Sequence, residues 1–315
     1  MCTAVSFQSG NHYFGRNLDV GGSYGESVVI TPRKYPLHLR YEKPLFSHYA
    51  MIGIGKVVDD YPLYYDGVNE KGLSIAGLNF PGNAYYYPKK AGSKNIAPFE
   101  LIPYLLSRCE NIREAEQVLL EINLVNTAFR EDIPLTPLHW LIADKNYSIV
   151  YECTKEGSRM YRNPFGVLTN SPPFSFHREN MNLYMGLHEG LAENRLSQKL
   201  KLQNTSIGFG AQGLPGDFSS SSRFVKAVYV KEKSEAPITE QQAVHQFFHI
   251  LSSVAMPKGS ILMENGQDEF TRYANCYNAD KGELYYQTYY DLNIKKVSLR
   301  QTALKNEKLI LFPIE

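Results

Sequence analysis

The sequence predicts an α+β protein whose antiparallel strands and helices form separate layers. Three observations indicate this class: strand patterns come in groups, helical patterns also come in groups, and no regular alternation of strand and helix points to a parallel sheet. The chain has 315 residues, a length that allows one or two domains. Because proline and glycine are scattered without forming a linker, we expect a single domain over residues 1–315.

Three antiparallel hairpins are predicted from strand-like runs interrupted by turn residues. The first turns at Gly10-Asn11, so the chain begins inside a sheet. The other two turn at residues 69–72 and 144–146. The paired strands are residues 2–7 with 12–18, 64–68 with 73–79, and 138–143 with 147–153.

Two helices are predicted between these hairpins, at residues 99–108 and 112–122. The second is opened by Asn111, with Glu114 three residues later as in a capping box. We expect both helices to pack on the outer face of a sheet.

A third helix follows later in the chain. Thr239 and Gln242 form a capping box at its start, and apolar residues then recur at helical spacing as far as Met256-Pro257. The remaining strands are predicted at residues 273–277, 284–291 and 308–313.

Composition argues against charged polymers and membranes as partners. The formal net charge is +1, which provides no basic field for nucleic acid or anionic lipid. No apolar run is long enough to cross a bilayer, and the N-terminus lacks the pattern of a secretory signal. We expect a soluble cytoplasmic protein that acts on a small molecule.

Cys2 is the residue that indicates a chemistry. Its small side chain allows the initiator methionine to be removed, which leaves a thiol and a free α-amine on one residue. Because this amine titrates near ~8, it can take the thiol's proton, and one residue then supplies both nucleophile and base. A cysteine at position 2 taken alone is more often a small apolar residue. The neighbouring residues therefore determine whether Cys2 is interpreted as a nucleophile.

The strand predicted to pair with Cys2 carries Arg16 and Asp19. A cation beside the thiol favours the thiolate, and a carboxylate could hold the α-amine. As a bare pattern, these two residues are more often an exposed ion pair of small effect. The other cysteines, Cys109, Cys153 and Cys276, form no CxxC pair and are typical of structural thiols, which makes a cysteine peptidase built on one of them the weaker alternative.

Five segments carry a more specific signal and occur in order along the chain. They are residues 1–3 (MCT), 15–19 (GRNLD), 72–81 (GLSIAGLNFP), 168–172 (LTNSP) and 214–224 (LPGDFSSSSRF). Together they resemble the cholylglycine hydrolases, a branch of the N-terminal nucleophile hydrolases, and among them the bile salt hydrolases of Gram-positive gut bacteria. The resemblance implies a four-layer αββα sandwich with two stacked antiparallel sheets, and it implies a homotetramer.

The resemblance also implies a role for each of six residues. They are Cys2 as nucleophile, Asp19 holding its amine, Arg16 beside the sulfur, Asn170 and the backbone N–H of Asn79 as the oxyanion hole, and Arg223 supporting the reacting centre. Two preorganised donors can each lower the barrier to an oxyanion by roughly 3 to 4 kcal/mol. Without the resemblance, the two asparagines are typical of turns, and the arginine is typical of a helix that starts after a serine cap.

Members of this family cleave conjugated bile salts or penicillin V with the same reacting residues. Asn79 favours bile salts, because many penicillin V acylases carry Tyr at that place. We expect mobile, partly apolar loops at residues 20–24, 61–65 and 129–138 to line the pocket, since aromatic side chains suit a rigid amphipathic ring system. The substrate-binding candidates are Val20, Tyr24, Tyr61, Leu63, Tyr65, Phe129, Ile133 and Leu138.

The predicted function is therefore hydrolysis of glycine- or taurine-conjugated bile salts, through a thioester on Cys2 after Met1 has been removed. Penicillin V or another N-acyl amide is the alternative substrate, and a non-catalytic small-molecule-binding protein is the alternative from another class.

No cofactor or metal is expected. His245 and His249 share one predicted helix but lack an acidic partner in a metal-binding arrangement. Residues 208–213 match the glycine spacing of a dinucleotide-binding loop, yet they lead into Leu214-Pro215-Gly216 instead of a helix.

Overall fold

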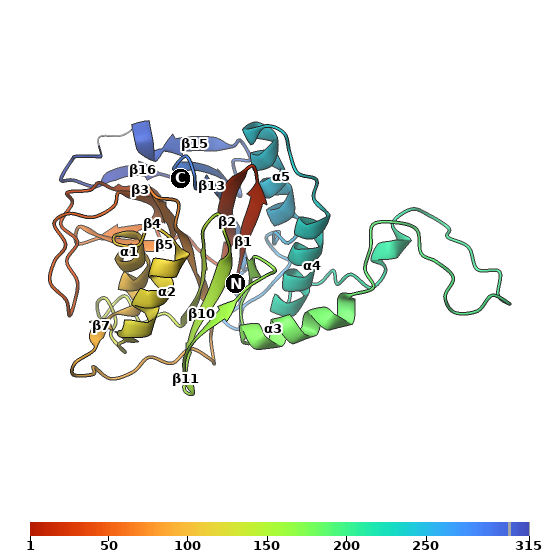
Figure 1. Cartoon of the computed structure of the whole chain (residues 1–315), viewed down its shortest axis with the longest axis horizontal. Helices are drawn as coiled ribbons and strands as arrows, with labels where there is room; N and C mark the ends of the chain where they lie inside the picture. The colour runs from red at the N-terminus through yellow and green to blue at the C-terminus, as the bar shows by residue number, and fades with distance from the viewer. Residues whose placement is uncertain (302–303, 315) are drawn as a thin grey trace.

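The computed structural model describes residues 1–301 and 304–314, and its elements form four layers (Figure 1). Two antiparallel sheets are stacked in the middle, with one pair of helices outside each sheet. This confirms the αββα sandwich that the family resemblance implies. The outer pairs are α1 (Leu101–Leu106) with α2 (Ile112–Glu121), and α4 (Ser220–Lys233) with α5 (Glu240–Ser252).

One sheet has six strands and contains the start of the chain. Its strands, in spatial order, are β12 (Val167–Leu168), β1 (Cys2–Ser9), β2 (Asn11–Val20), β13 (Phe270–Asn278), β14 (Glu283–Thr288) and β15 (Lys295–Ser298). The predicted first hairpin is present: Cys2 lies opposite Leu18, and Gly10 takes a φ of 69° in the turn. Glycine adopts this left-handed conformation without the steric cost of a side chain.

The other sheet has eight strands and contains the other two predicted hairpins and the final strand. In spatial order they are β11 (Gly157–Arg162), β10 (Ser148–Thr154), β9 (Leu138–Ala143), β6 (Ser74–Asn79), β5 (Tyr61–Asn69), β4 (Met51–Val58), β3 (Ser27–Thr31) and β16 (Ile310–Pro313). Outside both sheets, β7 (Lys94–Ile96) and β8 (Ile122–Leu124) form a short parallel pair.

Successive side chains of the eight-stranded sheet are buried on opposite faces of that sheet. In β9, Leu141 packs between the sheets, whereas Ile142 packs with the helices α1 and α2. Because both faces are covered, these strands are apolar at successive positions, unlike strands with one wet face. Helices α1 and α2 therefore pack on the outer face of this sheet, as predicted. Figure 1 shows α4 and α5 on the opposite side of the molecule, beside β1 and β2.

Several predicted boundaries need correction. Residues 99–108 form a short 3-10 turn (Pro98–Glu100) followed by α1, which ends at Leu106. At this end the side chain of Asn69 donates to the carbonyl of Leu106, a group that a helix terminus leaves without an intrahelical partner, and to the carbonyl of Cys109 beyond the helix. The last predicted internal strand, residues 284–291, ends at Thr288, where the chain turns back on itself.

The cap of α2 is only partly as predicted. The Asn111 side chain accepts from the backbone N–H of Glu114, but the Glu114 carboxylate accepts from the backbone of Glu110 and not from that of Asn111. The helix ends one residue early because Ile122 adopts an extended conformation and begins β8. The capping box of Thr239 and Gln242 at the start of α5 is confirmed.

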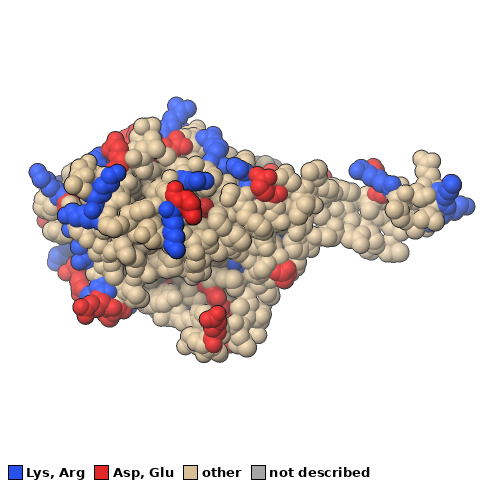
Figure 2. Space-filling view, turned by 90° about the horizontal axis from the view of Figure 1, so that it is seen from below, with Lys and Arg blue, Asp and Glu red and all other residues tan. Residues whose placement is uncertain are grey.

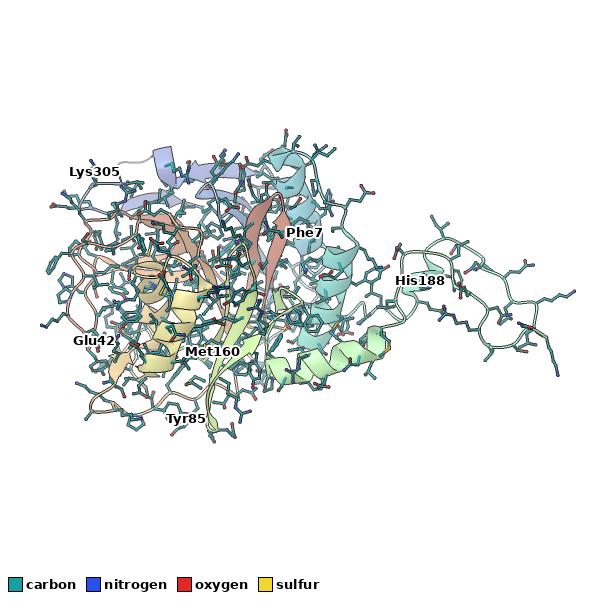
Figure 3. All side chains as sticks on the ribbon, in the orientation of Figure 1. Phe7, Glu42, Tyr85, Met160, His188 and Lys305 are labelled. Carbon is teal, nitrogen blue, oxygen red and sulfur yellow. The ribbon has the colours of Figure 1, made fainter. Side chains whose placement is uncertain are left out.

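A long segment between α3 (Phe174–Asn180) and α4 leaves the body of the molecule (Figures 1 and 3). We call residues 185–213 the arm. Its base is closed by two backbone hydrogen bonds, from His188 to Gly210 and from Gly210 to Gly190. The glycine-rich run 208–213 lies here and forms a short 3-10 turn (Phe209–Ala211), which confirms that it is no strand-turn-helix motif.

Candidate active site

Cys2 is the first residue of β1 and lies at the end of the six-stranded sheet. Its side chain is buried, with 4% of the residue exposed. The backbone N–H of Cys2 donates to Oδ1 of Asn170 at 2.9 Å. Asn170 directly follows Thr169, after the short strand β12 that pairs with β1, so the pairing of these two strands brings the cysteine and the asparagine together.

Arg223 fixes the backbone of Cys2 from the side of α4. Its Nη1 donates to the carbonyl of Cys2 at 2.5 Å and to Oγ1 of Thr3 at 2.7 Å, while Nη2 donates to Oδ1 of Asn170 at 2.7 Å. The helix begins with Ser219 as its N-cap, so the first turn of α4 presents this arginine to the sheet. Burial lowers the pKa of Arg223, although the charges of Asp19 and Cys2 act in the opposite direction.

Asn170 connects this group to Asn79 at the end of β6. Its Nδ2 donates to the backbone carbonyl of Asn79 at 2.7 Å, and its backbone N–H donates to Ser220 at 2.9 Å. An amide nitrogen carries two hydrogens, so the second remains for another acceptor. The side chain of Asn79 is exposed, consistent with a predicted role that uses its backbone.

Asp19 is fully buried at the end of β2. Its Oδ1 accepts from the hydroxyl of Thr271 at 2.6 Å, and among the described residues its Oδ2 has no hydrogen-bond partner. The amine of Met1 donates to the backbone carbonyl of Asp19 at 2.7 Å and forms an ion pair with Glu269. In the unprocessed chain, the carboxylate of Asp19 therefore has an uncommitted oxygen close to the N-terminus.

Arg16 crosses from the six-stranded sheet to the eight-stranded one. Its Nη1 donates to the carbonyls of Gly77 at 2.6 Å and Tyr65 at 3.2 Å, and its Nε lies 4.0 Å from Asp66. Burial acts to lower the pKa of Arg16, but the opposing field of Cys2 and the neighbouring acidic groups leaves that pKa raised. Arg16 is therefore a permanent, buried positive charge whose field acts on the Cys2 thiol.

A buried polar network around Asp66 was missed by the sequence analysis. Its carboxylate accepts from Tyr273 at 2.8 Å, Asn275 at 2.6 Å and Tyr277 at 2.5 Å, all on β13 of the facing sheet. Burial raises the pKa of Asp66, although Arg16 and these donors act to lower it. The signal in the sequence was a hydrogen-bonding side chain at every second position of a predicted strand, which places all three on one face.

The predicted pocket residues fall into separate groups. Tyr24, which is 52% exposed, meets the ring of Tyr65 edge-on, with centroids 6.3 Å apart. Tyr61 packs against Phe129, with centroids 5.7 Å apart, and against Phe99 at 5.8 Å. Of the four remaining candidates, Leu63 is buried within β5. The other three are partly exposed: Val20 and Leu138 lie at strand ends, and Ile133 lies in the loop 129–137.

One predicted loop is wrong. Residues 61–65 belong to β5, in the middle of the eight-stranded sheet, and Tyr61, Leu63 and Tyr64 are buried. Aromatic residues are favoured in strands, and this preference outweighs the tyrosine-rich appearance of a binding loop. Residues 21–24 and 129–137 do lie outside the strands.

The other cysteines are unsuited to nucleophilic attack. Cys109, Cys153 and Cys276 are buried, and burial raises the pKa of each thiol, that of Cys109 to about 12. A thiol with a raised pKa contains little of the reactive thiolate. These residues therefore pack as small apolar groups, and the cysteine peptidase alternative has no support from them.

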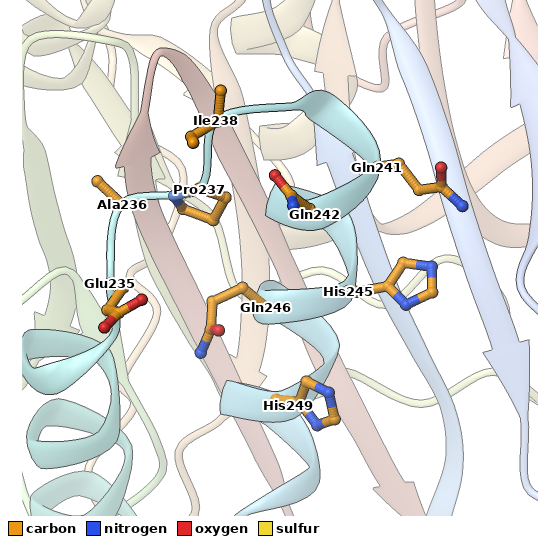
Figure 4. Close-up of a pocket in the computed structure, with 9 residues that line it drawn as sticks. All are labelled: Glu235, Ala236, Pro237, Ile238, Gln241, Gln242, His245, Gln246 and His249. Atoms are coloured by element: carbon orange, nitrogen blue, oxygen red, sulfur yellow. The ribbon is translucent and has the colours of Figure 1, made fainter.

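An open hollow of about 530 Å³ lies beside α5 (Figure 4). It is lined by residues 235–238 and by polar side chains of the helix, including His245 and His249. None of the predicted site residues lines it. Within residues 1–301 and 304–314, no group of three or more His, Cys, Asp and Glu side chains could hold a metal ion.

Charged residues of both signs are mixed on the face seen in Figure 2, where the arm extends from the body with charges gathered towards its tip. The described part of the chain contains no helix long and apolar enough to cross a membrane.

Comparison with known sequences identifies similar proteins over the whole chain. Residues 2–312 match the family described as linear amide C–N hydrolases, choloylglycine hydrolase family. The chain is 50% identical over 314 residues to a bile salt hydrolase/transferase of Lactiplantibacillus plantarum, a match that covers 100% of this chain and 97% of the relative. It is 40% identical over 318 residues to a conjugated bile acid hydrolase of Lactobacillus gasseri, covering 99% of this chain and 100% of the relative.

Solved structures give the same result. A C2A mutant of the conjugated bile acid hydrolase from Clostridium perfringens superposes with a TM-score of 0.93 at 34% identity, covering 100% of this chain and 97% of that one. Penicillin V acylase from Agrobacterium tumefaciens superposes with a TM-score of 0.78 at 18% identity, covering 98% and 90% of the two chains. At that identity the second likeness shows the fold alone.

Proposed function

The chain belongs to the choloylglycine hydrolase family of linear amide C–N hydrolases, and from this premise we propose how it acts as a choloylglycine hydrolase on conjugated bile salts. The substrate is a bile acid joined through an amide to glycine or taurine, and the products are the free bile acid and the amino acid. One observation carries the proposal: in a chain 50% identical to a bile salt hydrolase/transferase, Cys2 begins β1 and its backbone is held by Asn170 and Arg223.

The reaction begins after removal of Met1, which frees the α-amine of Cys2. This amine accepts the proton of the thiol as the sulfur attacks the amide carbon, and a tetrahedral oxyanion forms. The protonated amine then gives its proton to the leaving nitrogen, the C–N bond breaks, and the bile acid remains as a thioester on Cys2. The amine next activates a water molecule, which releases the free bile acid and restores the thiol.

The surrounding residues supply position and charge. We propose that the second hydrogen of Asn170 Nδ2 and the backbone N–H of Asn79 donate to the oxyanion, a role supported by the short link between these residues. Asp19 offers its uncommitted oxygen to the new amine, Arg16 stabilises the thiolate by its buried charge, and Arg223 holds the backbone of Cys2.

We also propose where the bile acid binds. Tyr24 and Tyr65 form an aromatic wall near the reacting centre, because Tyr65 also contributes the carbonyl that accepts from Arg16. Tyr61 on β5 and Phe129 form a second aromatic pair, and Val20, Leu63, Ile133 and Leu138 are proposed as further apolar contacts of the substrate. Aromatic and apolar walls suit the steroid ring system.

Side-by-side rates on glycocholate, taurocholate and penicillin V test the assignment. We expect release of glycine or taurine to be faster than cleavage of penicillin V. A faster rate on penicillin V would make the chain an N-acyl amidase of the alternative kind. Binding of glycocholate without turnover, with Met1 still present, would make it a binding protein.

A second activity is supported by the name of the relative that is 50% identical, which is a hydrolase/transferase. The same thioester can be attacked by an amine instead of water, which forms a new amide and leaves the same free thiol. Adding a primary amine during glycocholate turnover tests this, and a new bile acid amide detected by mass spectrometry is the expected product. Release of the free acid alone would limit the chain to hydrolysis.

The arm supports the homotetramer that we propose for this chain. It exposes several large apolar side chains, and Ile207 is 91% exposed. Exposed apolar side chains on a projecting segment are typical of a surface that contacts another subunit. The exposed apolar side chains of the arm are Met185, Leu191, Leu196, Leu200, Leu202 and Ile207.

We further propose that residues 1–315, less Met1, form one domain, because a single buried cluster joins both sheets to α4 and α5. A cytoplasmic location is proposed from the four free, buried cysteines, which suit a reducing compartment. Fractionation of cells, with detection of the chain and of glycocholate hydrolysis in each fraction, tests the location.

A further inference from the structure

Glu269 is a buried carboxylate beside the N-terminus for which the proposed mechanism has no role. It directly precedes β13, and 8% of the residue is exposed. Its carboxylate forms an ion pair with the amine of Met1. Among the described residues, this amine is the only charged or hydrogen-bonding group that pairs with the Glu269 side chain. Removal of Met1 therefore takes away its partner.

Covalent geometry places the same carboxylate near the nucleophile. The nitrogens of successive residues are at most about 3.7 Å apart, so a carboxylate in contact with the nitrogen of Met1 lies within about 6 Å of the nitrogen of Cys2. Cleavage of Met1 turns that second nitrogen into an amine. Glu269 precedes Thr271 by two residues at the start of β13, and Thr271 already contacts Asp19 in this region.

Several charged and titratable groups face this position. Cys2 itself lies on β1, Asp19 and Arg16 on β2, and Arg223 on α4. Burial lowers the pKa of the Met1 amine, the charges of Cys2 and Asp19 raise it, and those of Arg223 and Arg16 lower it. Two buried arginines thus oppose the protonated amine, and the ion pair with Met1 places the carboxylate of Glu269 beside it as well.

We propose that Glu269 is a positioning residue for catalysis: in the processed chain its carboxylate pairs with the α-amine of Cys2 and orients it toward the thiol. The inference rests on the proposed function, because it assigns the amine of Cys2 as the base. It adds a second carboxylate, from the loop before β13, to the one on Asp19. The amine is thereby held from β2 and from the loop that leads into β13, two neighbouring strands of the same sheet.

The pairing predicts a direction for the pH dependence. A nearby carboxylate favours the protonated amine and holds its pKa up, and an opposite charge at this distance shifts a pKa by about one to three units. The base must be neutral to accept the thiol's proton, so kcat/KM falls below that pKa. Replacing Glu269→Gln removes the charge and keeps the shape, so the acid limb of the profile moves to lower pH.

The test compares three variants of the processed enzyme over a range of pH with glycocholate. Glu269→Gln should move the acid limb of kcat/KM down by about one unit or more, whereas Glu269→Asp should restore most of its position. Glu264→Gln is the matched control, since Glu264 is an exposed glutamate in the same loop, and it should leave the limb unmoved. An unchanged limb in Glu269→Gln would overturn the proposal.

A second measurement needs no turnover and keeps the two proposals separate. In protein labelled with ¹⁵N-cysteine, the α-amine of Cys2 titrates as a distinct NMR signal. Its pKa should be lower in Glu269→Gln than in the unsubstituted chain and in Glu264→Gln. Equal amine pKa values would refute the role of Glu269 even in an active enzyme, whereas a shifted pKa without glycocholate hydrolysis would refute the proposed function alone.

Discussion

The reacting centre and the arm are built in opposite ways. Around Cys2, side chains from β1, β2, α4 and the end of β12 are buried, and they are held by hydrogen bonds between segments far apart in the sequence. The arm, residues 185–213, has hydrogen bonds among its own residues, such as those of Asn194 with Ser197 and Leu200, and it exposes its apolar side chains. The fold itself therefore preorganises the centre, whereas the arm needs a partner to bury its apolar surface.

The largest expected effect is at the nucleophile. Cys2→Ala removes the sulfur and leaves the backbone contacts to Asn170 and Arg223 in place, so turnover of glycocholate should fall by at least about 10³-fold while the fold is retained. Steady-state rates and circular dichroism check this. Substantial residual hydrolysis by folded Cys2→Ala protein would rule out Cys2 as the nucleophile.

The next effect distinguishes a buried arginine from an exposed one. Arg223→Lys keeps the charge but loses the planar fork that donates to Cys2, Thr3 and Asn170, so kcat should fall by about 10²-fold. Arg195→Lys on the arm is the matched control, because Arg195 pairs with Glu193 in an exposed position. We expect the control to be active within a factor of two or so of the unsubstituted chain. Equal rates for both variants would contradict the role of Arg223.

A smaller effect on rate is expected from the arm itself. Leu196→Ser with Ile207→Ser removes two exposed apolar groups, and light scattering should show a smaller assembly than the tetramer. Because neither residue is near Cys2, kcat should change by no more than a few-fold. Leu120→Ser, at an exposed apolar position on α2, is the control and should leave the assembly intact. A tetramer that survives the double substitution would place the subunit contacts elsewhere.

The smallest effect concerns the pocket. Tyr24→Leu removes the edge-on ring contact with Tyr65, a contact of about 0.5 to 1.5 kcal/mol. We expect KM for glycocholate to rise by roughly two- to tenfold with kcat little changed. A fall in kcat at constant KM would instead show that Tyr24 contributes to the reaction step and not to substrate binding.

Sequence patterns predicted the centre better than its support. The turn at Gly10-Asn11 predicted the hairpin that sets Cys2 beside β2. Asn170 and Arg223 were named only through the family resemblance, and both contact the backbone of Cys2. Asp66 and Glu269 were missed because each meets its partner across strands or sheets, and no local spacing encodes such a contact.

Local patterns also failed for the pocket and the arm. The run 61–65 has the composition of a binding loop, yet its place in the eight-stranded sheet makes it a strand. The projection of the arm could not be predicted, because its apolar residues look the same in sequence whether a core or another subunit covers them.

The state of the N-terminus tests the central claim most directly. Intact mass and glycocholate hydrolysis should be measured on the same preparations, one fully processed and one that retains Met1 because methionine aminopeptidase was inhibited during expression. We predict that amino acid release follows the fraction of chains lacking Met1, and that the retained form is folded and inactive. Equal activity of the two forms would show that the free α-amine of Cys2 is not required, and would contradict the mechanism.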